Sequence, residues 1–182
     1  MNLQGKRALI TGGTKGIGAP VALDLAAGGA DIAINARNRD ESTDELIQAI
    51  EALDRRCFFQ QGDLSQQSEA ERCVAESAEA LGGLEIMVHS AGGPSPGKIE
   101  DISVEQWHET FDIHVHAAFH LCRKSLPWFR KSGEGAIMDA QQRLSEKYTR
   151  LELLAGRLAE LSGSTQPRRA RLLREFVSQS RE

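Results

Sequence analysis

The chain has 182 residues, of which 40% are hydrophobic and 26% are charged, a balance that suits one soluble α/β domain with a sizeable core. No apolar run approaches the roughly 18 residues needed to cross a bilayer, and residues 1–5 lack a signal-peptide pattern. We therefore expect a cytoplasmic protein without membrane contact. The formal net charge of -4 argues weakly against general nucleic-acid binding.

The three cysteines, Cys57, Cys73 and Cys122, are odd in number and show no CxxC spacing. This usage indicates small buried hydrophobic residues in a reducing compartment rather than a disulfide set or a zinc site.

A glycine-rich stretch, TGGTKGIG at residues 11–18, lies between an apolar run at 7–10 and a segment with helical apolar spacing at 17–25. Glycines in such a turn permit positive φ and let the backbone approach a phosphate closely. The free N–H groups and the positive end of the following helix point at that phosphate. The stretch therefore predicts a nucleotide-binding loop.

Short apolar runs predict strands at 7–10, 30–36, 57–60, 84–89 and 136–138. Helices are expected between them, with Ser42 and Ser103 opening capping boxes and Ser65 capping a third helix. The alternation implies a parallel sheet with helices on both faces, and right-handed crossovers favour the strand order 3-2-1-4-5. We predict a Rossmann-like, doubly wound, three-layer α/β fold whose crevice holds the glycine loop and the loop after strand four.

The long helix expected from Ser103 to about residue 130 carries aromatic and histidine side chains. We interpret Trp107 and Phe111 as core residues. His116 and His120 lie four residues apart and form a possible metal pair, although a packing or subunit-contact role is favoured because no carboxylate or cysteine completes the set.

The chain changes character at residue 139. Only two of the 17 glycines lie beyond residue 138, and nine Lys or Arg stand against six Asp or Glu in 139–182. Leucines at steps of three and four predict an amphipathic helix at 141–161, and a second helix is expected at 168–180. We assign 1–138 to a dinucleotide-binding domain and 139–182 to a helical tail that covers a bare sheet face, pairs with another subunit, or is foreign to the domain through frameshift, fusion or truncation.

Four elements together resemble the classical short-chain dehydrogenase/reductase family over about residues 5–138. They are the TGxxxGIG loop, Asp63-Leu64, His89-Ser90-Ala91-Gly92 in place of the NNAG element, and His114 where the family usually has Asn. The resemblance implies a dinucleotide partner and thirteen cofactor-binding residues: Thr11, Gly12, Thr14, Lys15, Gly16, Ile17, Gly18, Arg37, Asp63, Leu64, Ser90, Ala91 and Gly92.

Charge at the end of strand two bears on the choice of cofactor. An NAD site usually has an acid there, which would repel a 2′-phosphate. This chain has Ala36 followed by Arg37, and Lys15 lies in the glycine loop. We therefore expect NADP(H) rather than NAD, the alternative being that both cations are solvated surface charges.

The resemblance also implies a Ser, a Tyr and a Lys that reduce a carbonyl or oxidise an alcohol. The only tyrosine, Tyr148, is followed four residues later by Glu152, so the YxxxK motif is absent. His114 is either part of a proton relay or a core histidine. The sequence thus indicates an NADP(H)-dependent oxidoreductase, or a catalytically impaired, truncated member of that family. The alternative is a non-catalytic dinucleotide-binding or interaction module that forms homo-oligomers through the 103–130 helix and the tail.

Overall fold

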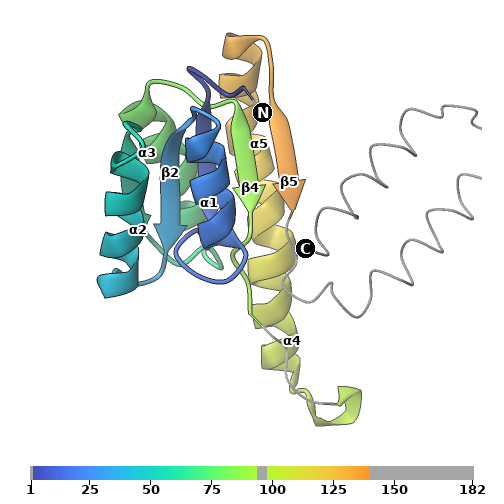
Figure 1. The fold of residues 1–182 in the computed structure, drawn as a ribbon. Coiled ribbons are helices and arrows are strands. Elements are labelled where there is room, and N and C mark those ends of the chain that lie inside the picture. The colour runs from blue at the N-terminus through green and yellow to red at the C-terminus, as the bar shows by residue number, and fades with distance from the viewer. Residues whose placement is uncertain (1, 94–97, 140–182) are drawn as a thin grey trace, which may run out of the picture. The chain divides into compact units, whose positions relative to one another are not determined.

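The computed structural model describes residues 2–93 and 98–139, and these form one parallel β-sheet flanked by helices (Figure 1). The strands are β1 (Arg7–Thr11), β2 (Asp31–Ala36), β3 (Cys57–Gln61), β4 (Ile86–His89) and β5 (Ala136–Asp139). Their order in the sheet is β3-β2-β1-β4-β5, which confirms the predicted topology.

The helices cover both faces of the sheet because successive strand residues point to opposite sides. Ala8 and Ile10 of β1 belong to the apolar cluster that includes residues of α1 (Gly18–Ala27) and α2 (Glu41–Glu51). Leu9 belongs to the opposite cluster, with residues of α3 (Gln67–Leu81) and α5 (Ala117–Ser132). The three-layer α/β/α architecture expected from the sequence is therefore present.

Two of the three predicted helix starts differ from the structure. The box of Ser103 with Gln106 does open α4 (Val104–Phe111). The N-cap of α2 is Asp40 instead of Ser42, because the Asp40 carboxylate accepts a hydrogen bond from the Thr43 N–H at 3.1 Å. Helix α3 begins after Gln66, without a side-chain cap, and the Ser65 N–H donates to Asp63 Oδ1 in the preceding turn.

The segment expected as one long helix is divided by a π-turn. A 3₁₀ turn at Ile99–Asp101 precedes α4, and the π-turn Asp112–His116 joins α4 to α5. Figure 1 shows α4 extending past the carboxyl ends of the strands, so it has no sheet to pack on there. The interpretation of Trp107 and Phe111 as core residues was therefore wrong: Trp107 is 46% exposed, and the two rings pack on each other at 4.7 Å between centroids.

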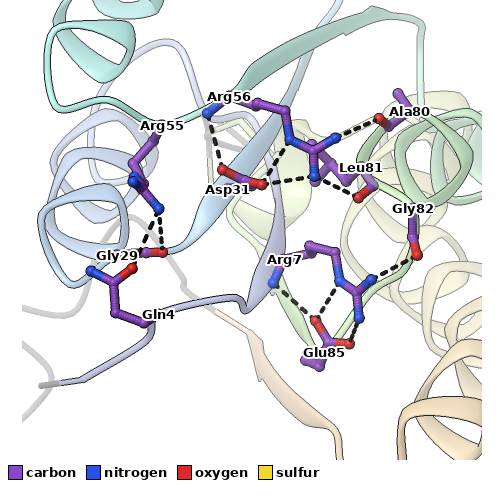
Figure 2. Close-up of polar contacts among 10 residues, drawn as sticks. All are labelled: Gln4, Arg7, Gly29, Asp31, Arg55, Arg56, Ala80, Leu81, Gly82 and Glu85. Carbon is purple, nitrogen blue, oxygen red and sulfur yellow. Dashed lines mark hydrogen bonds and ion pairs between the residues drawn. The ribbon is translucent and has the colours of Figure 1, made fainter.

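Ion pairs tie the strands together at their amino ends (Figure 2). The Glu85 carboxylate, just before β4, accepts hydrogen bonds from the backbone N–H and the guanidinium of Arg7 at the start of β1. Asp31 at the start of β2 accepts from Arg56 just before β3, at 2.8 Å from Nε. These ion pairs lie at the amino ends of the strands, opposite the carboxyl ends where the predicted nucleotide site lies.

Several predictions lie outside the described residues, namely the two tail helices, Tyr148 and Glu152. Of the cysteines, Cys73 is buried as expected, whereas Cys57 and Cys122 are only half-buried. No helix within 2–93 and 98–139 has the length and apolar character needed to cross a membrane.

Candidate functional site

The loops that carry the predicted site meet at the carboxyl edge of the sheet. The Gly13 N–H donates to Asn35 O at the end of β2, and the Ser90 N–H donates to Thr11 O at the end of β1, each at 3.1 Å. A third bond of this kind joins Gly62 to Ala36. The glycine loop and the loop after β4 are thus held side by side at the point where the strand order reverses, and the end of β3 lies beside the end of β2.

The glycine loop needs its glycines for two separate reasons. Gly12 and Gly16 adopt φ of +60° and +56°, a region that L side chains rarely enter. A Cβ at Gly12 would lie 2.7 Å from Ala91 Cα, and one at Gly18 would collide with Gly12 O. The loop therefore lies in direct backbone contact with the loop after β4, which gives the cradle its shape.

The start of α1 is open to an anion. No side chain in the described part of the chain caps this helix, and its first turn contains no acidic residue. The unpaired N–H groups and the helix dipole therefore present positive charge at Gly16, Ile17 and Gly18. The residues present fit the pyrophosphate of a dinucleotide at this point.

Thr11, at the end of β1, links the glycine loop to the loop after β4 through its side chain. Its side chain is fully buried, and Oγ1 accepts hydrogen bonds from the N–H groups of Ser90 at 3.2 Å and Ala91 at 3.3 Å. Thr14 is also buried. Ser90 Oγ is buried and has no hydrogen-bond partner in the portion of the chain that the structure describes.

Lys15 and Arg37 are the two cations that the sequence predicts for a 2′-phosphate. An acid that the sequence patterns did not indicate, Asp40, lies beside Lys15. Lys15 Nζ is 2.6 Å from Asp40 Oδ2, whereas the Arg37 side chain is exposed. The Lys15 ammonium, together with Ser42 and Thr43, holds the pKa of the Asp40 carboxyl well below its ordinary value. One of the two cations expected to hold a 2′-phosphate, Lys15, is thus paired with a carboxylate.

The end of β3 supplies Asp63 and Leu64. The Leu64 side chain is buried in the core, so only its backbone is available to a ligand. Asp63 is exposed, and its Oδ1 accepts from the Ser65 N–H at 3.1 Å. Two buried amides that sequence patterns did not point to, Asn35 and Gln60, hydrogen bond to each other at 2.7 Å and brace this edge.

His114 lies against the loop after β4. Its Nε2 is 3.0 Å from Gly93 O, and a Cβ on Gly92 would collide with its ring. His114 is half-buried and contacts Gly92 and Gly93, so the structure brings it to the predicted cofactor loop. Its role in a proton relay stays a prediction.

The two histidines considered as a metal pair make separate contacts. His116 Nδ1 is 2.8 Å from Asp112 Oδ1, and His120 Nδ1 is 4.0 Å from Glu71 Oε1 on α3. Within residues 2–93 and 98–139, no three His, Cys, Asp or Glu side chains are grouped as metal ligands.

The sheet is parallel, and a glycine-rich loop leads into an uncapped helix at the point where the strand order reverses. This arrangement is that of a dinucleotide-binding α/β protein. The family model described as "short chain dehydrogenase" matches residues 6–143. The chain belongs to the short-chain dehydrogenase family.

Relatives of known sequence or structure match the same part of the chain. General stress protein 39 of Bacillus subtilis is 36% identical over 129 residues, covering 70% of this chain and 45% of that protein. A short chain dehydrogenase from Burkholderia cenocepacia, crystallised in complex with NADP, is 38% identical with a TM-score of 0.68, covering 70% of this chain and 52% of that one. The NADH-dependent reductase A1-R′, responsible for alginate metabolism, is 25% identical with a TM-score of 0.70, covering 75% and 58%. The chain thus spans about half the length of the relatives it matches.

Proposed function

We propose that this chain binds NADP(H) at the carboxyl edge of its sheet. The observation that carries the proposal is the contact between the glycine loop and the loop after β4, where Gly12 leaves no room for a Cβ. Gly13 and Gly18 leave no room either, the first against Ile34 and the second against Gly12. The start of α1 would hold the pyrophosphate, and Asp63 would contact the adenine. The NADP complex of the Burkholderia relative supports this assignment.

The preference for NADP(H) over NAD(H) rests on charge. Lys15 and Arg37 are two cations beside the end of β2, and Ala36 leaves that end without a carboxylate of its own. Asp40 opposes the preference, because Lys15 must leave the Asp40 carboxylate to bind a phosphate. The relatives include both an NADP complex and an NADH-dependent reductase. We propose that the two cations outweigh the single acid.

Bound NADP(H) would supply a hydride for reduction of a carbonyl substrate, or accept one from an alcohol. His114, in the π-turn and in contact with the loop at Gly92 and Gly93, is the side chain we propose for proton relay. The family's Tyr-x-x-x-Lys motif is absent from this sequence. We therefore propose that this chain binds the dinucleotide and turns it over slowly at most, in the cytoplasm, where its three free cysteines stay reduced.

Turnover is tested by following NADPH oxidation with a broad panel of ketones. We expect saturable enhancement of NADPH fluorescence by the full chain and no oxidation above the rate without protein. Gly16→Trp blocks the loop at a positive-φ glycine and should abolish the fluorescence change. Rapid oxidation by the parent chain that is lost in Gly16→Trp would show that the chain is a competent reductase.

An exposed apolar stripe favours a second candidate, an interaction module that forms homo-oligomers. The stripe follows α4, the π-turn and α5, and consists of Val104, Trp107, Val115, Phe119 and Leu126. Phe119 is 57% exposed, and contiguous apolar surface of this kind usually marks a contact site. A second copy of the chain is the proposed partner.

Sedimentation velocity of the full chain tests this candidate. We expect a dimer or larger species that dissociates in the double variant Trp107→Ser, Phe119→Ser. Arg130→Ser on the same helix is the matched control, because it changes an exposed charge outside the stripe. An unchanged sedimentation coefficient in the double variant removes the assembly role and leaves NADP(H) binding untouched.

A further inference from the structure

His89 ends β4 directly behind the proposed cofactor loops, and its side chain is only 2% exposed. Both ring nitrogens have partners on different elements. Nδ1 lies 2.8 Å from Thr11 Oγ1 on β1, and Nε2 lies 3.0 Å from the backbone oxygen of Ile113 in the π-turn. His89 and Thr11 are also neighbours in the sheet register. The imidazole therefore bridges the glycine loop and the helix that carries His114.

The π-turn is what makes the Ile113 oxygen available. In an α-helix, the N–H of residue 117 would donate to the carbonyl of residue 113. Here the Ala117 N–H donates to Asp112 O, one residue earlier. The Ala117 N–H therefore does not bond to the Ile113 carbonyl, its partner in a regular α-helix, and that carbonyl needs another donor. His89 Nε2 supplies that donor.

The hydrogen-bond pattern fixes the protonation state of His89. Thr11 Oγ1 accepts from the Ala91 N–H and shares the Ser90 N–H with Thr11 O, so backbone donors already occupy its acceptor side. Its own hydrogen must then point to His89 Nδ1, which has to be an acceptor. Nε2 accordingly carries the ring proton and donates to Ile113 O. Only the neutral Nε2–H tautomer satisfies all four bonds.

A second proton on the ring would sit on Nδ1, facing a hydroxyl with no acceptor site left. Burial is the main influence on the His89 pKa, which it lowers. Two other titratable groups act on the ring from neighbouring elements: Asp139, its register partner on β5, favours the charged form, and His114 in the π-turn opposes it. The Ile113 hydrogen bond also favours the charged form, and burial outweighs it.

We propose that His89 is a positioning residue whose neutral ring clips Thr11 to the π-turn, and that protonation of His89 releases the clip and weakens dinucleotide binding. The proposal rests on the proposed function for its effect on binding. The unfolded chain binds this proton more readily than the folded chain. The contribution of the clip to the free energy of unfolding is therefore complete above the ordinary histidine pKa of about 6.5, and it is lost as the pH falls below that value.

The state of the ring is tested without any dinucleotide. Ring ¹⁵N NMR of the full chain near neutral pH should show His89 as the neutral Nε2–H tautomer, with a midpoint of protonation below that of an exposed histidine. A charged ring or an Nδ1–H tautomer at neutral pH would overturn the clip.

Binding is tested by calorimetry with NADP⁺, which survives acid, between about pH 8 and about pH 5. His89→Gln keeps one acceptor and one donor but does not titrate, whereas His89→Leu removes both. For the parent chain, the Kd should rise below the ring's midpoint by up to about tenfold per pH unit more than for His89→Gln. His89→Leu should bind weakly at every pH, and His89→Gln should restore the affinity seen at pH 8.

His108→Gln is the matched control, because it removes an exposed histidine on α4 outside the site, and its Kd should follow the same pH dependence as that of the parent chain. If the parent chain and His89→Gln show the same pH dependence, the proposal fails. If neither binds NADP⁺ at any pH, the proposed function fails, and the ¹⁵N spectrum alone then decides whether the clip exists.

Discussion

Replacing Gly12 by Ala tests the contact that shapes the cofactor cradle. The substitution adds one methyl group to a backbone at φ +60°, 2.7 Å from Ala91 Cα and N and 2.8 Å from Ser90 O. All three neighbours are backbone atoms, so none can rotate away. The strand-ending loops must separate to admit the methyl group.

The magnitude follows from two terms. An L residue in the left-handed region costs about 1–2 kcal/mol. Moving the loops apart to an ordinary contact requires about 0.7 Å, which would lengthen the Thr11 Oγ1 bonds to Ser90 and Ala91 beyond hydrogen-bonding range. Losing two such bonds costs about 1 kcal/mol each. We expect Gly12→Ala to lower the free energy of unfolding by about 3–4 kcal/mol.

Urea denaturation of three variants separates these terms. Gly133→Ala is the first control, since Gly133 has φ +79° and no atom within 4 Å of the added Cβ, so it reports the backbone term alone. Gly93→Ala is the second, with open space and no positive φ. We expect destabilisation to rise from Gly93→Ala through Gly133→Ala to Gly12→Ala. If Gly12→Ala destabilises no more than Gly133→Ala, the loop contact is not the constraint we describe.

Three further predictions concern single side chains. Glu85→Gln removes the carboxylate that accepts three hydrogen bonds from Arg7 (Figure 2), and should lower the free energy of unfolding in urea by about 2–3 kcal/mol. Asp40→Asn keeps the helix cap and frees Lys15, so the ratio of NAD⁺ to NADP⁺ dissociation constants, measured by calorimetry, should rise about fivefold. Burial raises the pKa of the Cys73 thiol to about 12. Iodoacetamide should therefore modify Cys73 about a thousandfold more slowly in the folded chain than in the unfolded chain, with the extent of modification followed by mass spectrometry.

The first two predictions have a control variant, and each of the three has a result that would contradict it. Glu134→Gln breaks the exposed pair with Lys6 and should change stability by under about 1 kcal/mol; an equal effect at Glu85 would contradict the first prediction. Asp44→Asn breaks the pair with Arg39 and should leave cofactor preference unchanged; an equal shift from both variants would contradict the second. Alkylation of the native thiol at the unfolded rate would contradict the third.

The fold could be predicted because its signals are local and repeat along the chain. Apolar runs of strand length and the Ser103 capping box appear in the structure as expected. The start of α2 was misplaced because Asp40 and Ser42 are both good caps two residues apart, and only the backbone geometry selects Asp40. Trp107 was misplaced because a periodic apolar face indicates that something covers it, without indicating whether the cover is the same chain.

The site could be predicted only as far as its residues belong to one continuous motif. The glycine loop was recognisable from its glycine pattern, and the Ser90–Gly92 segment from its resemblance to the family's NNAG element. The Lys15–Asp40 pair joins residues of different elements, and the π-turn that exposes Ile113 O depends on one hydrogen bond shifted by a single residue. No pattern of residue types encodes that shift, so the bridging role of His89 became visible only in three dimensions.

The most direct test of the proposed function is calorimetric titration of the full chain with NADP⁺ and with NAD⁺, beside the double variant Lys15→Ala, Arg37→Ala. We predict saturable binding at one site per chain, tighter for NADP⁺ in the parent chain and equal for both dinucleotides in the double variant. A folded parent chain that shows no saturable heat with either dinucleotide would contradict the account.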